Sequence, residues 1–357
     1  MAMKSENSIS REYARLMRRK WLFMLLAAVL LIIALVAATF MGYTDLSVKN
    51  LLATLSPEWG DARGVAALTK TQQVILLELR LPRVLTAVIV GAALGVCGTV
   101  MQSTTGNIMA SPFTTGISSA AGLGAAIGIL FHPFGTSDTS VILCAFTMGM
   151  LNAAVVYGVT AVTSLGPGGM ILVGVALNFL FSSANSLLQY VASEDQLSQI
   201  VHWSFGSFTG VTWPQIAVMA AALVLGYLLF RHYAWSFNIM SSGGDETAKA
   251  LGVNATRVRV VSGICVTVVA AVTISFVGVI GFVGIVAPHV ARIVIGSEHK
   301  ILLPGSLLIG GLLVLVADTI GRLIVAPTII PVGVVLSVVG APIFLYLILT
   351  QRRRKLY

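Results

Sequence analysis

Long, nearly uninterrupted runs of apolar residues constrain this chain more than any other feature. Only 10% of the 357 residues are charged, whereas soluble domains carry about 25%. The polar residues are therefore too few to coat a soluble globule, and runs of about 17 residues or more predict membrane-spanning helices. We expect an all-α, polytopic helical bundle in a single transmembrane domain, 21–350. Nine runs are evident, at about 21–41, 83–101, 114–131, 141–162, 170–191, 214–230, 258–277, 303–325 and 332–350.

Basic residues cluster at both ends of the chain, within 1–20 and within 351–357. Lysine and arginine beside apolar spans favour the cytoplasmic side, so both ends are predicted to be cytoplasmic in a bacterial or archaeal cell membrane. The first run, 21–41, exceeds the roughly 7–15 apolar residues of a signal peptide and is read as an uncleaved span. The net charge of +9 is thereby explained without nucleic acid, for which no aromatic and basic platform is present.

Nine crossings would leave the two ends on opposite sides, so the charge pattern demands a tenth. Only 278–302 has room for it, and there Pro288 and several glycines interrupt the hydropathy. We expect a short or broken helix at about 280–296, which is tolerable at membrane depth only where protein or a water-filled cavity surrounds it. With ten spans, all lysines and arginines fall inside except Lys49, Arg63, Lys70, Arg80, Arg83 and Arg322.

Two groups of ionisable residues lie near the predicted outer ends of spans. Asp318 and Arg322 are four residues apart on one helix face, which suits an ion pair. The pair is either structural, or Arg322 reaches the outer surface to meet a partner. Arg80 and Arg83 flank Pro82 just outside the second long run. They are either interfacial anchors or a positive docking edge on the outer face.

The polar stretch 241–256, between two spans, contains the sequence GDETAKALG. Its two acids suit a helix N-terminus, and its last glycine can end a short helix in the left-handed conformation. An alanine and a leucine, three positions apart, are expected to form a small apolar contact face. The stretch is either a connector or a cytoplasmic docking element. Its candidate residues are Gly244, Asp245, Glu246, Ala248, Leu251 and Gly252.

Polar residues at helical spacing also mark the fifth span, where Asn178, Ser182 and Asn185 are candidates for lining a pathway. His289 has no Cys or His companions, and we interpret it as a packing or capping residue. The chain contains no Walker A, HExxH, CxxC or GxSxG motif. We therefore expect no catalytic, cofactor or metal site and no enzymatic role.

Several long motifs together resemble the permeases of iron-siderophore, haem and vitamin B12 ABC importers. They include LRLPRVLTAVIVGAALGVCGTVMQ, GVALNFLFSSANSLL, GDETAKALGV, GFVGIVAPHVAR and PVGVVLSVVGAP. The resemblance runs from about Leu79 to Leu347 and implies ten spans, a dimer (a homodimer or a pair with a close homologue), two ATPase subunits inside and a substrate-binding protein outside. One departure is Ile329-Ile330 before Pro331, where the family often has a glutamate.

The resemblance also implies residue roles. Arg80, Arg83 and Arg322 match arginines that pair with acidic residues of the binding protein, and GDETAKALG matches the segment that couples the permease to its ATPase. The function expected is therefore the permease subunit of an ATP-driven importer for a chelated metal compound. The alternatives are an ion-coupled secondary transporter and a channel. A secondary transporter usually needs acidic or histidine relays within the membrane, whereas Asp318 is the sole acid within a predicted span.

Overall fold

The computed structural model describes residues 2–42, 47–56, 65–163, 166–325 and 328–354, and within these ranges it is helical with no strand. Arg63 and Lys355, which the charge pattern included, lie outside the described residues. The spanning helices are α1 (Ala2–Phe40), α5 (Leu81–Thr105), α6 (Ile117–Phe131), α7 (Ser137–Thr163), α8 (Pro167–Val191), α10 (Trp213–His232), α12 (Ala255–Val277), α13 (Val283–Ile295), α14 (His299–Leu323) and α15 (Val332–Arg354). Shorter elements are α2 (Val48–Leu55), α4 (Lys70–Val74), η1 (Ile75–Arg80), η2 (Pro112–Thr115), α9 (Glu194–Ser204) and α11 (Ala234–Ala250).

Ten apolar helices match the ten predicted spans. Seven described helical segments are long and apolar enough to cross a membrane, and three shorter apolar helices, α6, α13 and the 332–345 part of α15, complete the set. The short helix predicted at about 280–296 is α13, which spans Val283–Ile295. The helical bundle and its roughly ten crossings are therefore confirmed.

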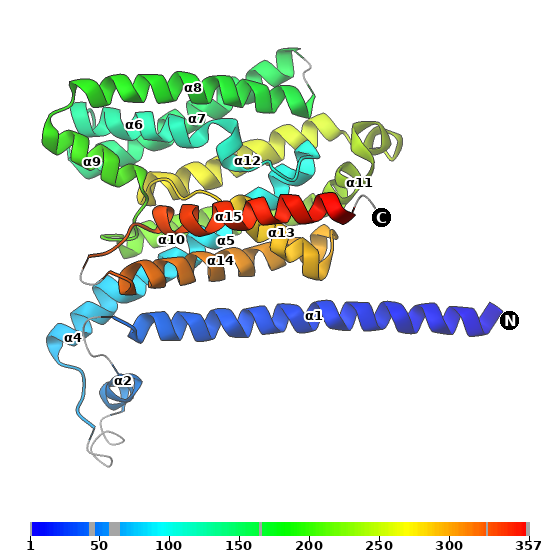
Figure 1. The fold of residues 1–357 in the computed structure, drawn as a ribbon, viewed down its shortest axis with the longest axis horizontal. Coiled ribbons are helices and arrows are strands. Elements are labelled where there is room, and N and C mark those ends of the chain that lie inside the picture. The colour runs from blue at the N-terminus through cyan, green and yellow to red at the C-terminus, as the bar shows by residue number, and fades with distance from the viewer. Residues whose placement is uncertain (1, 43–46, 57–64, 164–165, 326–327, 355–357) are drawn as a thin grey trace.

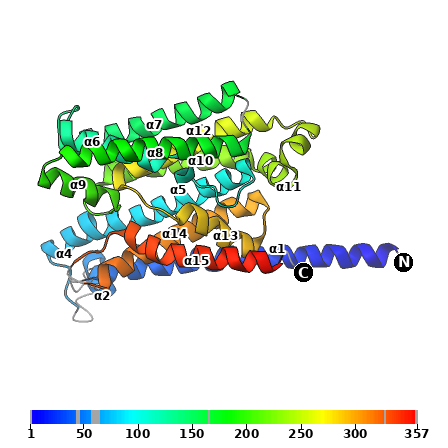
Figure 2. The same cartoon turned by 45° about the horizontal axis from the view of Figure 1, so that its top comes forward.

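The helices run back and forth along one common direction, as Figures 1 and 2 show. The start of α1, the end of α15 and α11 lie at one end of the bundle, which we name the α11 end. The end of α1 and the helices α4 and α9 lie at the opposite end, which we name the α9 end. An even number of crossings places both termini on the same side, as the charge pattern requires.

Helix α5 is the central element of the bundle. In the segment Lys70–Thr105, 83% of the most apolar 18-residue stretch is buried, whereas the corresponding share in α8 is 11%. Helix α5 therefore lies in the core, and α8 lies on the surface. Glycines allow its neighbours to approach closely. A Cβ atom added to Gly91 would overlap the carbonyl oxygen of Gly310 in α14, and one added to Gly98 would overlap that of Gly284 in α13. Such small-residue contacts are typical of transmembrane helix packing.

Three local features refine the helix boundaries. Helix α1 begins at Ala2, because the basic segment before Trp21 contains good helix formers and no proline or glycine. Pro82 lies in the first turn of α5, which directly continues the helical segment that begins at Lys70 and includes the π-helix η1. Pro288 lies inside α13.

Candidate functional site

At the α9 end, Arg83 and Asp318 form a buried, two-pronged ion pair between α5 and α14. Both the Nε and Nη2 atoms of Arg83 donate to the carboxylate of Asp318, and the shortest distance is 2.7 Å. The Asp318 side chain is only 1% exposed. Arg322 Nε also lies 3.2 Å from the carboxylate, so the structural pair predicted at i,i+4 spacing is confirmed. One carboxylate therefore serves two guanidinium groups.

Arg80 and Arg322 also bind the C-terminal end of α1. The last carbonyl groups of a helix have no partner within the helix and carry the negative end of its dipole. Arg80 Nη1 donates to the carbonyls of Thr39 and Phe40, at 3.2 and 3.0 Å. Arg322 Nη2 donates to Ala38 O at 3.0 Å. These arginines hold the end of α1 against the end of α14 and the start of α5.

The structure thus brings together the three arginines predicted to dock a partner, but it does not project them into solvent. The exposed fractions are 7% for Arg80 and 8% for Arg83, and 10% for the Arg322 side chain. We name this group, with Asp318, the arginine cluster. Two of its three guanidinium groups, those of Arg83 and Arg322, lie within 3.2 Å of the one carboxylate, and the third binds the end of α1.

At the α11 end, the polar stretch GDETAKALG forms a short helix as predicted. The helix α11 is broken at Gly244, whose φ of 70° and ψ of −169° are not helical. Gly252 has φ +78°, and the Val253 amide donates to Ala248 O at 2.8 Å. This bond closes the helix with the left-handed glycine cap that the sequence predicts. We name residues 245–250 the loop helix.

The predicted apolar contact face of this segment is not present. Ala248 is 0% exposed and belongs to the core cluster that includes Val253 and Val258, whereas Leu251 is 56% exposed. The two side chains therefore lie in different environments, because the packing of the loop helix on α12 decides which side faces inward. The exposed residues between 245 and 251 are Asp245, Glu246, Thr247, Lys249, Ala250 and Leu251.

A buried arginine that the sequence analysis did not single out fixes the loop helix. Arg259, in the first turns of α12, is 4% exposed. Its Nη2 pairs with Asp245 at 2.5 Å, and its Nε donates to Thr104 O at 2.9 Å, in the last turn of α5. Asp245, at the start of the loop helix, is thus tied to the central helix. Asp245 and Arg259 are 14 positions apart in the sequence and lie on two helices joined by a turn. Helical periodicity therefore does not predict their contact.

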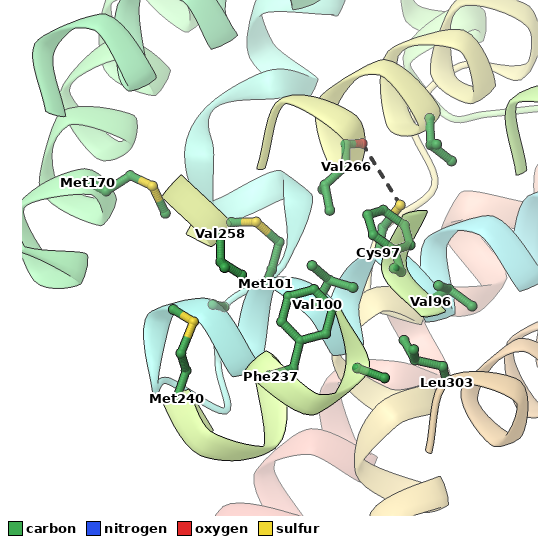
Figure 3. Packing of buried hydrophobic residues seen from close by; sticks show 14 of the residues in the cluster. Val96, Cys97, Val100, Met101, Met170, Phe237, Met240, Val258, Val266 and Leu303 are labelled. Atoms are coloured by element: carbon green, nitrogen blue, oxygen red, sulfur yellow. Dashed lines mark hydrogen bonds between the residues drawn. The ribbon is translucent and has the colours of Figure 1, made fainter. Parts of the chain in front are cut away.

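The half of α11 before the break anchors this end in the core. Figure 3 shows Phe237 and Met240 among Val100 and Met101 of α5 and Val258 of α12. Phe237 is fully buried. The loop helix therefore stands on a packed base, while its outer side is exposed.

On α8, the candidate pathway residues lie partly on an exposed face. Asn178 and Ser182 are exposed, and Asn185 is half-buried with an Oδ1 atom that has no partner among the described residues. Their neighbours on the same helix include exposed large apolar side chains such as Phe179, at 72%, and Leu187, at 64%. Polar side chains on the exposed face of an otherwise apolar helix are costly to place against lipid tails.

The fold and these two specialised ends define a polytopic membrane transport protein. The chain belongs to the FecCD transport family, whose model matches residues 30–350. It is 34% identical to a putative ABC transporter permease protein of Methanocaldococcus jannaschii, over 97% of this chain and 99% of the relative. It is 35% identical to the hemin transport system permease protein of Yersinia pestis, over 92% and 95% of the two chains.

A solved structure supports the same assignment. It is described as an inward-facing conformation of a putative metal-chelate type ABC transporter, and the two folds agree with a TM-score of 0.80 at 29% identity. The match covers 92% of this chain and 99% of the other. The resemblance that the motifs predicted is therefore confirmed, and the chain is a transmembrane permease.

Proposed function

We propose that this chain forms half of the membrane pathway of an ATP-driven importer for a chelated metal compound. Relatives are named as permeases for hemin, Fe(3+)-citrate and cobalamin, which supports an iron-siderophore, haem or corrinoid as cargo. The observation that carries the proposal is the loop helix. It is an exposed element on a packed base, at the same end as the start of α1 and the end of α15, and the ion pair of Asp245 with the buried Arg259 ties it to the central helix.

In this proposal the α11 end is cytoplasmic and the loop helix couples the permease to an ATPase. The exposed residues Glu246, Lys249 and Leu251 supply the contact, and Gly244 and Gly252 allow the sharp turns on either side. Asp245 transmits force inward, since its partner Arg259 also binds Thr104 O at the end of α5. One ATPase subunit would bind each of two permease copies, and the ATPases would hydrolyse ATP.

The arginine cluster is proposed to attract an acidic substrate-binding protein to the α9 end. Because Arg80, Arg83 and Arg322 are largely buried and already paired, their proposed contribution is the field of their positive charges rather than new ion pairs made by long, free side chains. Fields of this kind raise association rates without large changes in contact area. Ile329, which replaces the glutamate that the family often has, leaves this end without one further acid.

The exposed polar face of α8 is proposed to face the pathway between two copies of the chain. Asn178, Ser182 and Asn185 would then meet water or cargo instead of lipid, which removes the cost of placing them in hydrocarbon. The apolar side chains beside them would contact the second copy or lipid. A homodimer satisfies this arrangement with two identical α8 faces.

The alternative of an ion-coupled secondary transporter needs an acid that can exchange an ion within the membrane. Asp318, the acid that the sequence places within a span, is instead bound by Arg83 and lies beside Arg322. This arrangement favours a structural role for the carboxylate. It therefore favours the ATP-driven reading.

The test is reconstitution of the permease in proteoliposomes with candidate ATPase and binding proteins. Labelled ferric siderophores, haem and cobalamin are offered outside, with or without ATP inside. We expect uptake of one cargo class that requires ATP, the ATPase and the binding protein together. Uptake driven by an ion gradient without ATP would identify a secondary transporter, and passive flux without either would identify a channel.

A further inference from the structure

A small polar cavity lies at the α11 end, separate from the loop helix. Its volume is about 270 Å³, and it is lined by residues from α5, α11, α13 and the start of α14. The polar lining includes Gln102, Ser103, Ser241, Ser242, Arg292 and His299. None of the residues that line it is acidic, so the cavity has a positive character that comes from Arg292.

Arg292 lacks the carboxylate partner that three other arginines of the bundle have. Arg83, Arg259 and Arg322 each lie within 3.2 Å of a carboxylate oxygen. Arg292 has no carboxylate within 4.0 Å among the described residues, and its one hydrogen bond is from Nη2 to Gln102 Oε1, at 3.1 Å. Its Nη1 atom is buried and has no partner in the described part of the chain. Arg292 is half-buried, and a charge taken partly out of water without a counter-ion is unfavourable.

A second buried donor lines the same cavity. Gln102 is 3% exposed, and its Nε2 atom has no hydrogen-bond partner among the described residues. His299 does not compensate for either group, since its ring nitrogens are engaged by Ser103 and by Asn238, the latter at 2.6 Å. Two unsatisfied nitrogen donors, one of them cationic, thus remain around one cavity. Buried polar groups normally have partners.

We propose that this cavity binds a single phosphate group. Its oxygens would accept hydrogen bonds from Arg292 Nη1 and Gln102 Nε2, and the hydroxyls of Ser241 and Ser242 are available nearby. Guanidinium groups bind phosphate with strong, charge-assisted hydrogen bonds. The phosphate would supply the missing counter-ion and join α5 to α13. Free inorganic phosphate and the headgroup of an anionic lipid offer the same chemistry.

This ligand lies beyond the transport function proposed above. It would hold the inner ends of α5 and α13 together beside the base of α11, and its binding would stabilise the folded chain in proportion to its occupancy. The loop helix would keep its separate tie to α5 through Arg259. A change in phosphate binding would therefore alter the contact between α5 and α13, whereas a change at the loop helix would alter the Arg259 contact with α5.

The test uses the full chain in nanodiscs of phosphatidylcholine alone. Inorganic phosphate is titrated against chloride at constant ionic strength, and thermal unfolding is followed. We expect a saturable rise in Tm, with an apparent affinity at least about tenfold weaker in Arg292→Gln, because a hydrogen bond to a charged group is lost. Arg257→Gln, which changes an exposed arginine at the same end of the bundle, should respond like the parent.

A second arm replaces part of the phosphatidylcholine with phosphatidylglycerol and omits phosphate. A rise in Tm that depends on Arg292 in this arm alone would identify the lipid headgroup as the source. An equal response in the parent and in Arg292→Gln, or no response to either anion, would overturn the proposal.

Gln102→Glu keeps the test decisive if Arg292→Gln does not fold. The substitution preserves the shape of the side chain and places a carboxylate beside the Arg292 guanidinium. We expect this variant to unfold at a higher Tm than the parent without phosphate and to lose the phosphate response. A response to phosphate equal to that of the parent would contradict the site.

Discussion

Arg80 and Arg322, far apart in the sequence, cap the same helix end. Their guanidinium groups bind consecutive carbonyls of α1, from Ala38 to Phe40. Arg322 in turn lies 3.2 Å from Asp318, which pairs with Arg83. The α9 end is therefore held by a chain of charges that runs from α1 through α14 to α5. Its stability should depend on the single carboxylate.

Asp318→Asn should destabilise the chain strongly. The substitution leaves two largely buried guanidinium groups without their counter-ion, and breaking a buried pair in this way costs about 3–5 kcal/mol. The free energy of unfolding, measured in nanodiscs, checks the expectation. Asp138→Asn is the matched control, since Asp138 is exposed in the first turn of α7 and its loss should cost about 1 kcal/mol at most. Equal losses in the two variants would refute the structural role of Asp318.

Arg322→Gln should slow capture of an acidic binding protein in a salt-dependent manner. The variant removes one positive charge from the arginine cluster. The Debye screening length is about 10 Å at 0.1 M salt but only about 3 Å at 1 M, so the field of the cluster reaches a partner less far at high salt. We expect the association rate to fall several-fold at low salt and to converge with that of the parent at 1 M. Arg257→Gln, at the opposite end, should leave the association rate unchanged at both salt concentrations. Kinetics that are identical at every salt concentration would exclude the cluster from docking.

Cysteine labelling should establish which end of the bundle faces the cytoplasm. In a background without the three native cysteines, a cysteine at Ser137 or Ser198 should react with an impermeant thiol reagent added to intact cells. A cysteine at Ser242 should react only after the cells are broken. Both helices that carry the first two positions begin at the α9 end. Reaction of position 242 in intact cells would reverse the proposed orientation.

Ala248→Asp and Leu251→Asp should separate folding from coupling. Ala248 is 0% exposed, so an aspartate there buries a charge and should lower the stability of the chain by several kcal/mol. Leu251 is 56% exposed, so an aspartate there should leave Tm close to that of the parent. It should instead reduce co-purification of the ATPase and substrate-stimulated ATP hydrolysis. Normal ATPase capture by a folded Leu251→Asp variant would remove this residue from the contact.

Gly98→Ala should destabilise the core far more than Gly158→Ala. The new methyl group at position 98 would overlap the Gly284 carbonyl, whereas a Cβ atom at position 158 has open space around it. Overpacking typically costs about 1–3 kcal/mol, and a backbone obstacle leaves little room to relax. Gly158→Ala should be neutral or stabilise the helix by up to about 1 kcal/mol. Thermal unfolding of both variants provides the measurement, and equal Tm values would argue against the close helix approach.

The spans and the loop helix could be predicted because their signals are local. Hydropathy over about 20 residues identifies a crossing regardless of its neighbours. Likewise, Gly244 and Gly252 mark the limits of the loop helix through backbone conformation alone, and the Asp318–Arg322 pair follows from helical spacing.

The tertiary partners could not be predicted in the same way. No local sequence pattern around Arg83 predicts its ion pair with Asp318. Likewise, no pattern around Asp245 predicts that its partner Arg259 also binds Thr104 O. The three-residue spacing of Ala248 and Leu251 predicts only that their side chains point in similar directions from the helix axis. It does not state which direction is inward, and packing against α12 decides that.

The glycine contacts of α5 act as a lock on helix register. Gly91 faces the backbone of Gly310, and Gly98 faces that of Gly284, with no side-chain layer between. Sliding α5 by one residue, about 1.5 Å, would bring a Cβ atom against a carbonyl group. Helices α5, α13 and α14 therefore move together as one body. The sliding and tilting that alternate access requires must then fall on helices outside this body, such as α8, whose most apolar stretch is only 11% buried within the chain.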